Sequence, residues 1–399
     1  MVDESVSRAA DAAAAAVDAD QVIRFARALI AAPSENPGGT EDQAAAVATE
    51  ILEALDASPR TIRSEAGRPN VLAAIGSGAR PRLAWNGHLD VVPAGSLDTW
   101  RSGGPWSGEI VDGRLVGRGA ADMKGPVAAA LAAASAIRRA GIELAGTFEL
   151  HLAADEELAG IHGTKVLWDL GLLDQDAAIV GEPSELQVGL AERGGAWFTA
   201  TAFGKAAHGS QPHLGVNAIT SMSRFLLRLP EVLPDLAHPL VGRPTVNAAL
   251  IEGGSAPNVV PDRCTVDIDR RVIPGETEPA KVRAPFLALV ESLRAAHPEV
   301  EIEVELREWT DAAEAPIDSR IAALARDAVE RETGARPADV GFTGITDARF
   351  YINQAKIPTV IVGPGSLTVA HTADESVAVD ELVAAARSYA RIVVGFCGI

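Results

Sequence analysis

The sequence predicts an α/β domain with a mainly parallel central sheet, plus an inserted smaller α+β domain. In the outer parts of the chain, short apolar runs alternate with helical patterns, and polar residues follow directly after these runs. This alternation is typical of parallel α/β sheets. The middle of the chain instead shows strands followed by helices. We therefore expect a first part of the α/β domain over 1–193, the inserted domain over 194–308 and a second part of the α/β domain over 309–399.

Each expected element follows from a local pattern. Ala-rich stretches predict one helix within residues 1–20 and another over 122–139, the latter closed by Gly141. In such a sheet, functional groups gather at the carboxyl ends of the strands. The apolar runs predict central strands over 83–85, 147–153, 177–180 and 357–362. In the inserted domain we expect strands over 196–202, 264–270 and 300–306, and helices over 216–229 and 278–296.

Composition narrows the class of protein. The hydrophobic content of 47% suffices for a large core, and the net charge of -19 gives no electrostatic reason to bind nucleic acid or an anionic membrane. The acidic N-terminal segment lacks the features of a secretory signal, and the chain has no long apolar run. Cys264 and Cys397 have no second cysteine at metal-ligand spacing, so we expect reduced thiols. A cytoplasmic protein is the expectation.

Candidate metal ligands occur in five separate segments, each at an expected strand end or in a loop. Each segment alone has a structural alternative: Asp122 could cap its helix, for example, and Glu156 and Glu157 could be solvated acids. Zinc sites need oxygen or imidazole ligands on rigid elements, and paired metals need a bridging carboxylate. The occurrence of all five segments in order favours a metal centre. They are GHLD (87–90), GRGAADMKG (117–125), DEE (155–157), GEP (181–183) and AHT (370–372).

Six longer motifs resemble those of the di-zinc metallopeptidase family that holds acetylornithine deacetylase, succinyl-diaminopimelate desuccinylase, aminoacylase-1 and the glutamate-releasing carboxypeptidases. The resemblance runs from about Asp20 to the end of the chain. It implies that the α/β domain is the catalytic domain and that the inserted α+β domain is a lid or dimerisation domain. The motifs are GHLDVVP (87–93), GRGAADMKG (117–125), DEELAGIHG (155–163), GEPS (181–184), AHGSQPHLGVNAI (207–219) and GGSAPNVVPD (253–262).

The resemblance implies a role for each residue of the centre. Glu156 would be the general base: it would take a proton from water, which then becomes a metal-bridging hydroxide. It would later pass this proton to the leaving amine. Asp90 would orient His88 through its second ring nitrogen. His208, on the inserted domain, would stabilise the oxyanion in the site of a partner subunit. The implied ligands are His88 and Glu182 on one metal, Glu157 and His371 on the other, and Asp122 between them.

The resemblance also implies residues that bind the substrate. Arg271 matches an arginine that binds a carboxylate, a role that suits the two donors of a guanidinium group. The adjacent Arg270 remains an alternative, because the register of the match is open. Asn258, Arg349 and the backbone amide of Gly365 are further candidates.

These observations predict metal-dependent hydrolysis of the amide bond of a small N-acyl amino acid or a related carboxylate-bearing amide. A dipeptidase or carboxypeptidase remains open, because the same metals cleave both kinds of bond. A non-catalytic protein that binds small carboxylates is the alternative from another class, but every ligand position and Glu156 carry competent side chains. The expected cofactors are two divalent ions, zinc by ligand type, with cobalt or manganese also fitting. The expected partners are a small-molecule substrate and a second copy in a homodimer.

Overall fold

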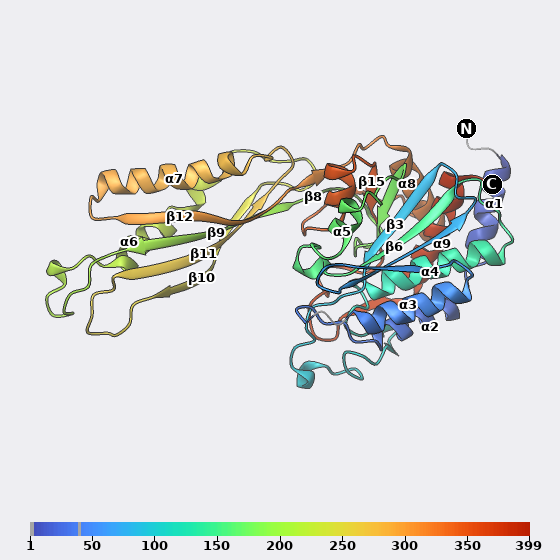
Figure 1. The fold of residues 1–399 in the computed structure, drawn as a ribbon, viewed down its shortest axis with the longest axis horizontal. Coiled ribbons are helices and arrows are strands. Elements are labelled where there is room, and N and C mark those ends of the chain that lie inside the picture. Colours follow the sequence, from blue (N-terminus) through green and yellow to red (C-terminus); the bar gives the residue numbers. More distant parts are fainter. Residues whose placement is uncertain (1–3, 39–40) are drawn as a thin grey trace. The chain divides into compact units, whose positions relative to one another are not determined.

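The computed structural model describes residues 4–38 and 41–399, which form two compact units (Figure 1). The larger unit contains the chain up to Leu190, together with Glu314–Phe342 and Thr346–Ile399. The smaller unit contains Ala191–Ala313 and Thr343–Ile345, so it is inserted between stretches of the larger one. Its service as a lid or dimerisation domain stays a prediction.

A nine-stranded sheet forms the centre of the larger unit. Its middle strands are parallel: β3 pairs with β6 and with β7, and β7 pairs with β15, whereas β1 and β2 are antiparallel. The predicted fold class is therefore confirmed. The order is β1 (Arg60–Arg63), β2 (Pro69–Gly76), β6 (Thr147–Ala153), β3 (Arg82–His88), β7 (Ala177–Val180), β15 (Thr359–Ile361), β8 (Val188–Glu192) and β13 (Ala313–Glu314), with β14 (Asp339–Phe342) beside β8.

Helices cover this sheet, and α4 packs between α2 and α9 (Figure 1). Its many alanines favour a helix and let neighbouring helices approach closely. The helix predicted over 122–139 begins two residues late, at Lys124, and its N-cap residue Met123 makes no side-chain capping bond. The helices of this unit are α1 (Glu4–Ala15), α2 (Ala19–Ile30), α3 (Asp42–Ala54), α4 (Lys124–Arg139), α5 (Thr164–Asp169), α8 (Arg320–Thr333) and α9 (Val379–Cys397).

Two further features complete the larger unit. The predicted N-terminal helix is confirmed as α1, whereas residues 1–3 of that prediction lie outside the described residues. A separate three-stranded sheet has the order β16 (Ser376–Ala378), β5 (Arg114–Val116) and β4 (Glu109–Val111). Within residues 4–38 and 41–399, no helix is both long and apolar enough to cross a membrane.

The smaller unit is a four-stranded antiparallel sheet with two helices, α6 (Ala218–Leu227) and α7 (Pro279–Ala296), packed on it (Figure 1). The sheet order is β10 (Thr245–Gly253), β11 (Arg263–Val272), β9 (Gly194–Phe203) and β12 (Glu301–Thr310). Phe198 of β9 stacks on Phe286 of α7 with ring centroids 4.4 Å apart, whereas its neighbour Trp197 is 50% exposed. This alternation places one face of the sheet in a core of its own.

The core of the smaller unit gives a stability prediction. Phe286→Ala removes a fully buried ring, so we expect unfolding of this unit to become easier by about 3–5 kcal/mol. Urea unfolding followed by hydrogen exchange in β9 and β12 measures the change, because a two-unit chain need not unfold in one step. The control Leu287→Ala alters a neighbour on the same helix that is 42% exposed, and should shift stability by less than about 0.5 kcal/mol. Equal effects of the two variants contradict the packing described.

Candidate metal centre

Three neighbouring parallel strands bring the candidate ligands to one edge of the central sheet. His88 is the last residue of β3, and the strand predicted over 83–85 extends to it. Glu156 and Glu157 begin a single 3₁₀ turn just after β6, and Glu182 follows β7. Because the carboxyl ends of parallel strands meet at the same edge, side chains far apart in sequence converge there.

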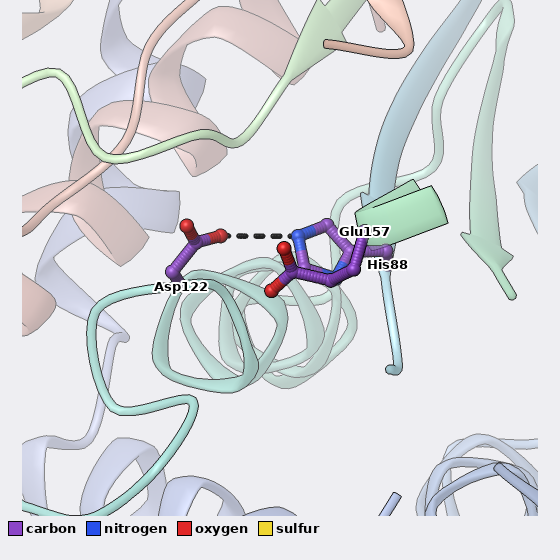
Figure 2. Close-up of side chains that lie close together, drawn as sticks. All are labelled: His88, Asp122 and Glu157. Atoms are coloured by element: carbon purple, nitrogen blue, oxygen red, sulfur yellow. Dashed lines mark hydrogen bonds and ion pairs between the residues drawn. The ribbon is translucent and has the colours of Figure 1, made fainter. Parts of the chain in front are cut away.

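Asp122 lies between two imidazoles. Its Oδ1 is 3.0 Å from His88 Nε2, and its Oδ2 is 3.4 Å from His371 Nε2. Figure 2 shows Asp122 facing the ring of His88, with Glu157 beside the same ring. The carboxylate is thus directed at imidazoles instead of capping α4, which explains why the helix begins at Lys124. One oxygen toward each imidazole is the geometry that a bridging ligand needs.

The remaining candidate ligands complete two groups around this carboxylate. His371 Nε2 lies 3.1 Å from Glu157 Oε2, and His88 Nε2 lies 3.7 Å from Glu182 Oε1. Ligand atoms within 4.8 Å of one another form the sets His88–Asp122–Glu157 and His88–Glu156–Glu182. The structure therefore brings all five ligands predicted from the sequence into one place in the larger unit.

The centre concentrates buried negative charge. Burial raises the pKa of Glu182 and of Glu156 well above their ordinary values, and neighbouring carboxylates raise both further. Burial acts the same way on Asp122, but hydrogen bonds from His371 and His88 outweigh it and lower the pKa of Asp122. The Oε1 atom of Glu182 is buried with no hydrogen-bond partner among the described residues. Buried carboxylates of this kind require compensation, and oxygen and imidazole donors suit divalent cations.

Asp90 contacts both the His88 ring and the turn that carries Glu156 and Glu157. The Nδ1 atom of His88 is 2.9 Å from the backbone carbonyl of Asp90 and 3.4 Å from its Oδ1. The same carboxylate accepts the backbone N–H groups of Glu156 at 3.1 Å and of Glu157 at 3.2 Å. Asp90 thus contacts the His88 ring as expected from the sequence, and it also fixes the turn that carries the two glutamates.

Asn36 is a contributor that the sequence analysis missed. It is buried, and its Nδ2 donates to Asp90 Oδ2 at 2.8 Å and to Asp155 Oδ1 at 3.1 Å. Arg68 Nη1 donates to the same oxygen of Asp155 at 3.2 Å. Asn36 follows an N-terminal helix and lies in none of the motifs, so no local pattern pointed to it.

His208 and Asn258 lie together on the smaller unit. The segment of His208 pairs with Val259 in an antiparallel bridge, and Gly209 N–H donates to the carbonyl of Asn258 at 2.7 Å. His208 is exposed, and its Nδ1 accepts the backbone N–H of Ser210 at 3.2 Å. Nδ1 also lies 2.8 Å from Ser210 Oγ, so Ser210 contacts this ring nitrogen through both its backbone and its side chain.

The two adjacent arginines of β11 differ in environment. Arg270 is buried and donates to Glu276 Oε1 at 2.5 Å, whereas the side chain of Arg271 is 31% exposed and contacts Asp269 Oδ2 at 3.0 Å. Successive residues of a strand point to opposite faces, so only one of the pair can enter the core. This difference favours Arg271 over Arg270 as the residue that meets a ligand.

Arg349 and Gly365, the other predicted substrate contacts, make bonds within the larger unit. Arg349 is buried and donates through Nη1 to the carbonyl of Thr346 at 2.5 Å and through Nη2 to that of Ala159 at 2.6 Å. Gly365 N–H donates to Glu381 Oε1 at 3.0 Å. Arg349 therefore fastens the loop that follows Glu156 and Glu157.

This fold and this centre define a metal-dependent hydrolase. The profile of peptidase family M20/M25/M40 matches residues 84–394, and the chain belongs to that family. The family relation and the centre together assign metal-dependent amide hydrolysis to the chain.

Individual relatives support the same assignment. The chain is 33% identical to a succinyl-diaminopimelate desuccinylase of Rhodospirillum rubrum over 402 residues, covering 94% of this chain and 98% of the relative. It is 32% identical to an acetylornithine deacetylase of Myxococcus xanthus over 334 residues, covering 81% and 82%. The fold is also that of Bacillus subtilis YXEP, described as a dinuclear metal binding peptidase from the M20 family, whose structure superposes with a TM-score of 0.71 at 18% identity, covering 94% of this chain and 97% of that one.

The ligand geometry predicts metal stoichiometry. His371→Ala removes one imidazole beside Asp122 and Glu157, so bound metal should fall from about two ions per chain to about one. Asp122→Ala removes the contact to both imidazoles and should reduce the bound metal below about one ion per chain. Elemental analysis after dialysis against zinc measures both values. The control His297→Ala, a surface histidine of the smaller unit, should retain the full content, and an unchanged content in Asp122→Ala contradicts the assignment.

Proposed function

We propose that this protein removes the acyl group from small N-acyl amino acids or related carboxylate-bearing amines, using two divalent metal ions. The observation that carries the proposal is the Asp122 carboxylate, with one oxygen toward His88 and the other toward His371. Glu182 lies on the His88 side and Glu157 on the His371 side. We assign one metal to each side, zinc by ligand type, with cobalt or manganese able to occupy the same donors.

Glu156 is the proposed general base. Bound divalent ions supply Lewis acidity, which lowers the pKa of water and polarises an amide carbonyl. Glu156 Oε2 lies 3.9 Å from His88 Nε2, and its backbone is fixed by Asp90. Its side chain keeps 11% exposure at the centre. A carboxylate held there accepts a proton from the attacking water and returns it to the nitrogen of the leaving amine.

Residues of the smaller unit contribute the contacts to the substrate in this proposal. His208 offers an Nε2–H donor for the oxyanion of the tetrahedral intermediate, in the site of a partner subunit of a homodimer. Arg271 binds the substrate carboxylate, because a partly exposed guanidinium matches two oxygens with two donors. Asn258 is a second substrate-binding residue in this proposal. Arg349 and Gly365 support loops of the larger unit.

The acyl group is assigned from the relatives. Two relatives that match 93–94% of this chain at 33% identity are named succinyl-diaminopimelate desuccinylases, and another at 32% identity is named an acetylornithine deacetylase. We therefore propose a succinyl or acetyl group on an amino acid. Dipeptides are the alternative substrates, since the same centre would cleave a peptide bond.

The proposed reaction predicts the effect of removing the base. Glu156→Gln should lower kcat/KM by about 10²–10⁴-fold without loss of metal, because the amide cannot accept a proton. The assay uses N-succinyl, N-acetyl and N-carbamoyl amino acids and dipeptides with metal-loaded enzyme. Glu143→Gln, at an exposed position after α4, is the matched control and should retain wild-type rates. Absence of turnover on the whole panel, with both metals bound, contradicts the hydrolase proposal.

The proposed role of His208 predicts complementation between inactive variants. His208→Ala should lower kcat by about 10²–10³-fold with unchanged metal content. Mixing it with Glu156→Ala should restore about a quarter of the wild-type rate, since half of the dimers are hybrids with one competent site. The control His213→Ala, exposed five residues further along the chain, should stay active. A fully active monomer, or no recovery on mixing, would overturn the role in a partner's site.

A further inference from the structure

We propose that Glu375 is a positioning residue that holds the Asp122 carboxylate in place between His88 and His371. The inference rests on the proposed metal-binding role of Asp122. It concerns a glutamate outside the ligand set that acts through the backbone of the segment that carries Asp122.

Glu375 is fully buried, and both of its carboxylate oxygens accept hydrogen bonds. Oε1 accepts the backbone N–H of Ala121 at 3.0 Å and that of Asp122 at 3.1 Å. Oε2 accepts Nη1 of Arg118 at 2.5 Å. The backbone carbonyl of Glu375 accepts the N–H of Gly117 at 2.9 Å. One residue thus binds the segment from Gly117 to Asp122 at four points.

The part of this segment that carries Asp122 lies outside helix and strand. The residues from Ala120 to Met123 form turns, and α4 begins only at Lys124 without a capping side chain. The N–H groups of Ala121 and Asp122 precede the helix, so they have no acceptor within it. Oε1 of Glu375 supplies that acceptor to both. Because both N–H groups are fixed, the direction in which the Asp122 side chain leaves the backbone is fixed as well.

Arg118 orients the glutamate. Its guanidinium is buried, lies 5.4 Å from the centre of the Trp100 ring and is held by the Glu375 ion pair. With Oε2 directed at Arg118, Oε1 is the oxygen left to face the two backbone N–H groups. The buried ion pair thus takes Oε2 and the two backbone N–H groups take Oε1, which fixes the orientation of the carboxylate.

Glu375 itself belongs to the loop that carries His371. Asp374 Oδ1 accepts the N–H of Arg101 at 2.8 Å and of Ser102 at 3.3 Å, and Ser376 begins β16, which pairs with β5. Glu375 lies between these two anchors, four residues after His371. It therefore joins the loop of one imidazole ligand to the segment of the bridging carboxylate. Asp90 makes the same kind of contact when it accepts the consecutive N–H groups of Glu156 and Glu157.

The test is Glu375→Gln in the cobalt-loaded protein. Glutamine has the same size, but both ends of its side chain would meet only donors, so its NH₂ group must oppose either Arg118 or the two backbone N–H groups. We expect about 10–100-fold weaker cobalt binding by calorimetry, an altered visible spectrum at full loading and a comparable fall in kcat with KM little changed. A merely structural role would lower the stability of the metal-free protein without changing the spectrum of the loaded one.

Asp374→Asn is the matched control, because it alters the same loop without touching Asp122, and its cobalt affinity and spectrum should remain those of the wild type. Glu375→Asp keeps the charge and should shift the cobalt affinity and the spectrum in the same direction as Glu375→Gln, but by less. This variant replaces Glu375→Gln in the test if the glutamine variant fails to fold. A wild-type cobalt affinity and spectrum in the folded Glu375 variant overturns the inference. Failure of the wild type itself to bind cobalt overturns the proposed function instead, so the two failures are distinguishable.

Discussion

The structure of the larger unit depends on the compensation of buried carboxylates at the carboxyl edge of its central sheet. Five carboxylates lie around two imidazoles, and burial opposes the negative charge of each. They belong to Asp90, Asp122, Glu156, Glu157 and Glu182. Backbone N–H groups and one asparagine satisfy Asp90, but Glu182 keeps a buried oxygen without a partner among the described residues. Such an arrangement persists in a folded protein because cations offset it, and two divalent ions supply charge of the required order.

The backbone segments that carry these buried carboxylates approach one another, or fold back on themselves, very closely. A Cβ atom at Gly125 would lie 2.1 Å from the carbonyl oxygen of Ala120, and one at Gly163 would lie 1.9 Å from that of Ala154. Glycine is therefore required where the segments of Asp122 and of Glu156 fold back on themselves. Together with the carboxylate contacts of Asp90, these approaches leave the metal-facing side chains little freedom, which is what a preorganised metal site needs.

The sequence predicted the parallel sheet and the convergence of the ligands because both follow from local patterns. Apolar runs define buried strands, and a polar residue directly after a buried strand must lie at the sheet edge. Contacts made by long side chains across sequence distance leave no such pattern. A sequence records an arginine at position 349 but not that it turns toward the carbonyl of Ala159, and Asn36 carries no local signal of its contact with Asp90. The start of α4 was misplaced for a related reason, since the tertiary contact of Asp122 with His88 prevails over helix capping.

In the proposed function, the larger unit carries the metal centre and the smaller unit contacts the substrate. The larger unit invests its polar side chains in a rigid, buried centre, which is indifferent to the acyl group of an amide. The smaller unit places His208 and Arg271 at partly or fully exposed positions on a sheet with its own core, so these residues can change without disturbing that core. In the proposed function, discrimination between succinyl, acetyl and peptide substrates would therefore belong to exposed groups near β11 and the segment of His208. The strand alternation that buries Arg270 against Glu276 leaves Arg271 as the charged member of the pair that faces outward.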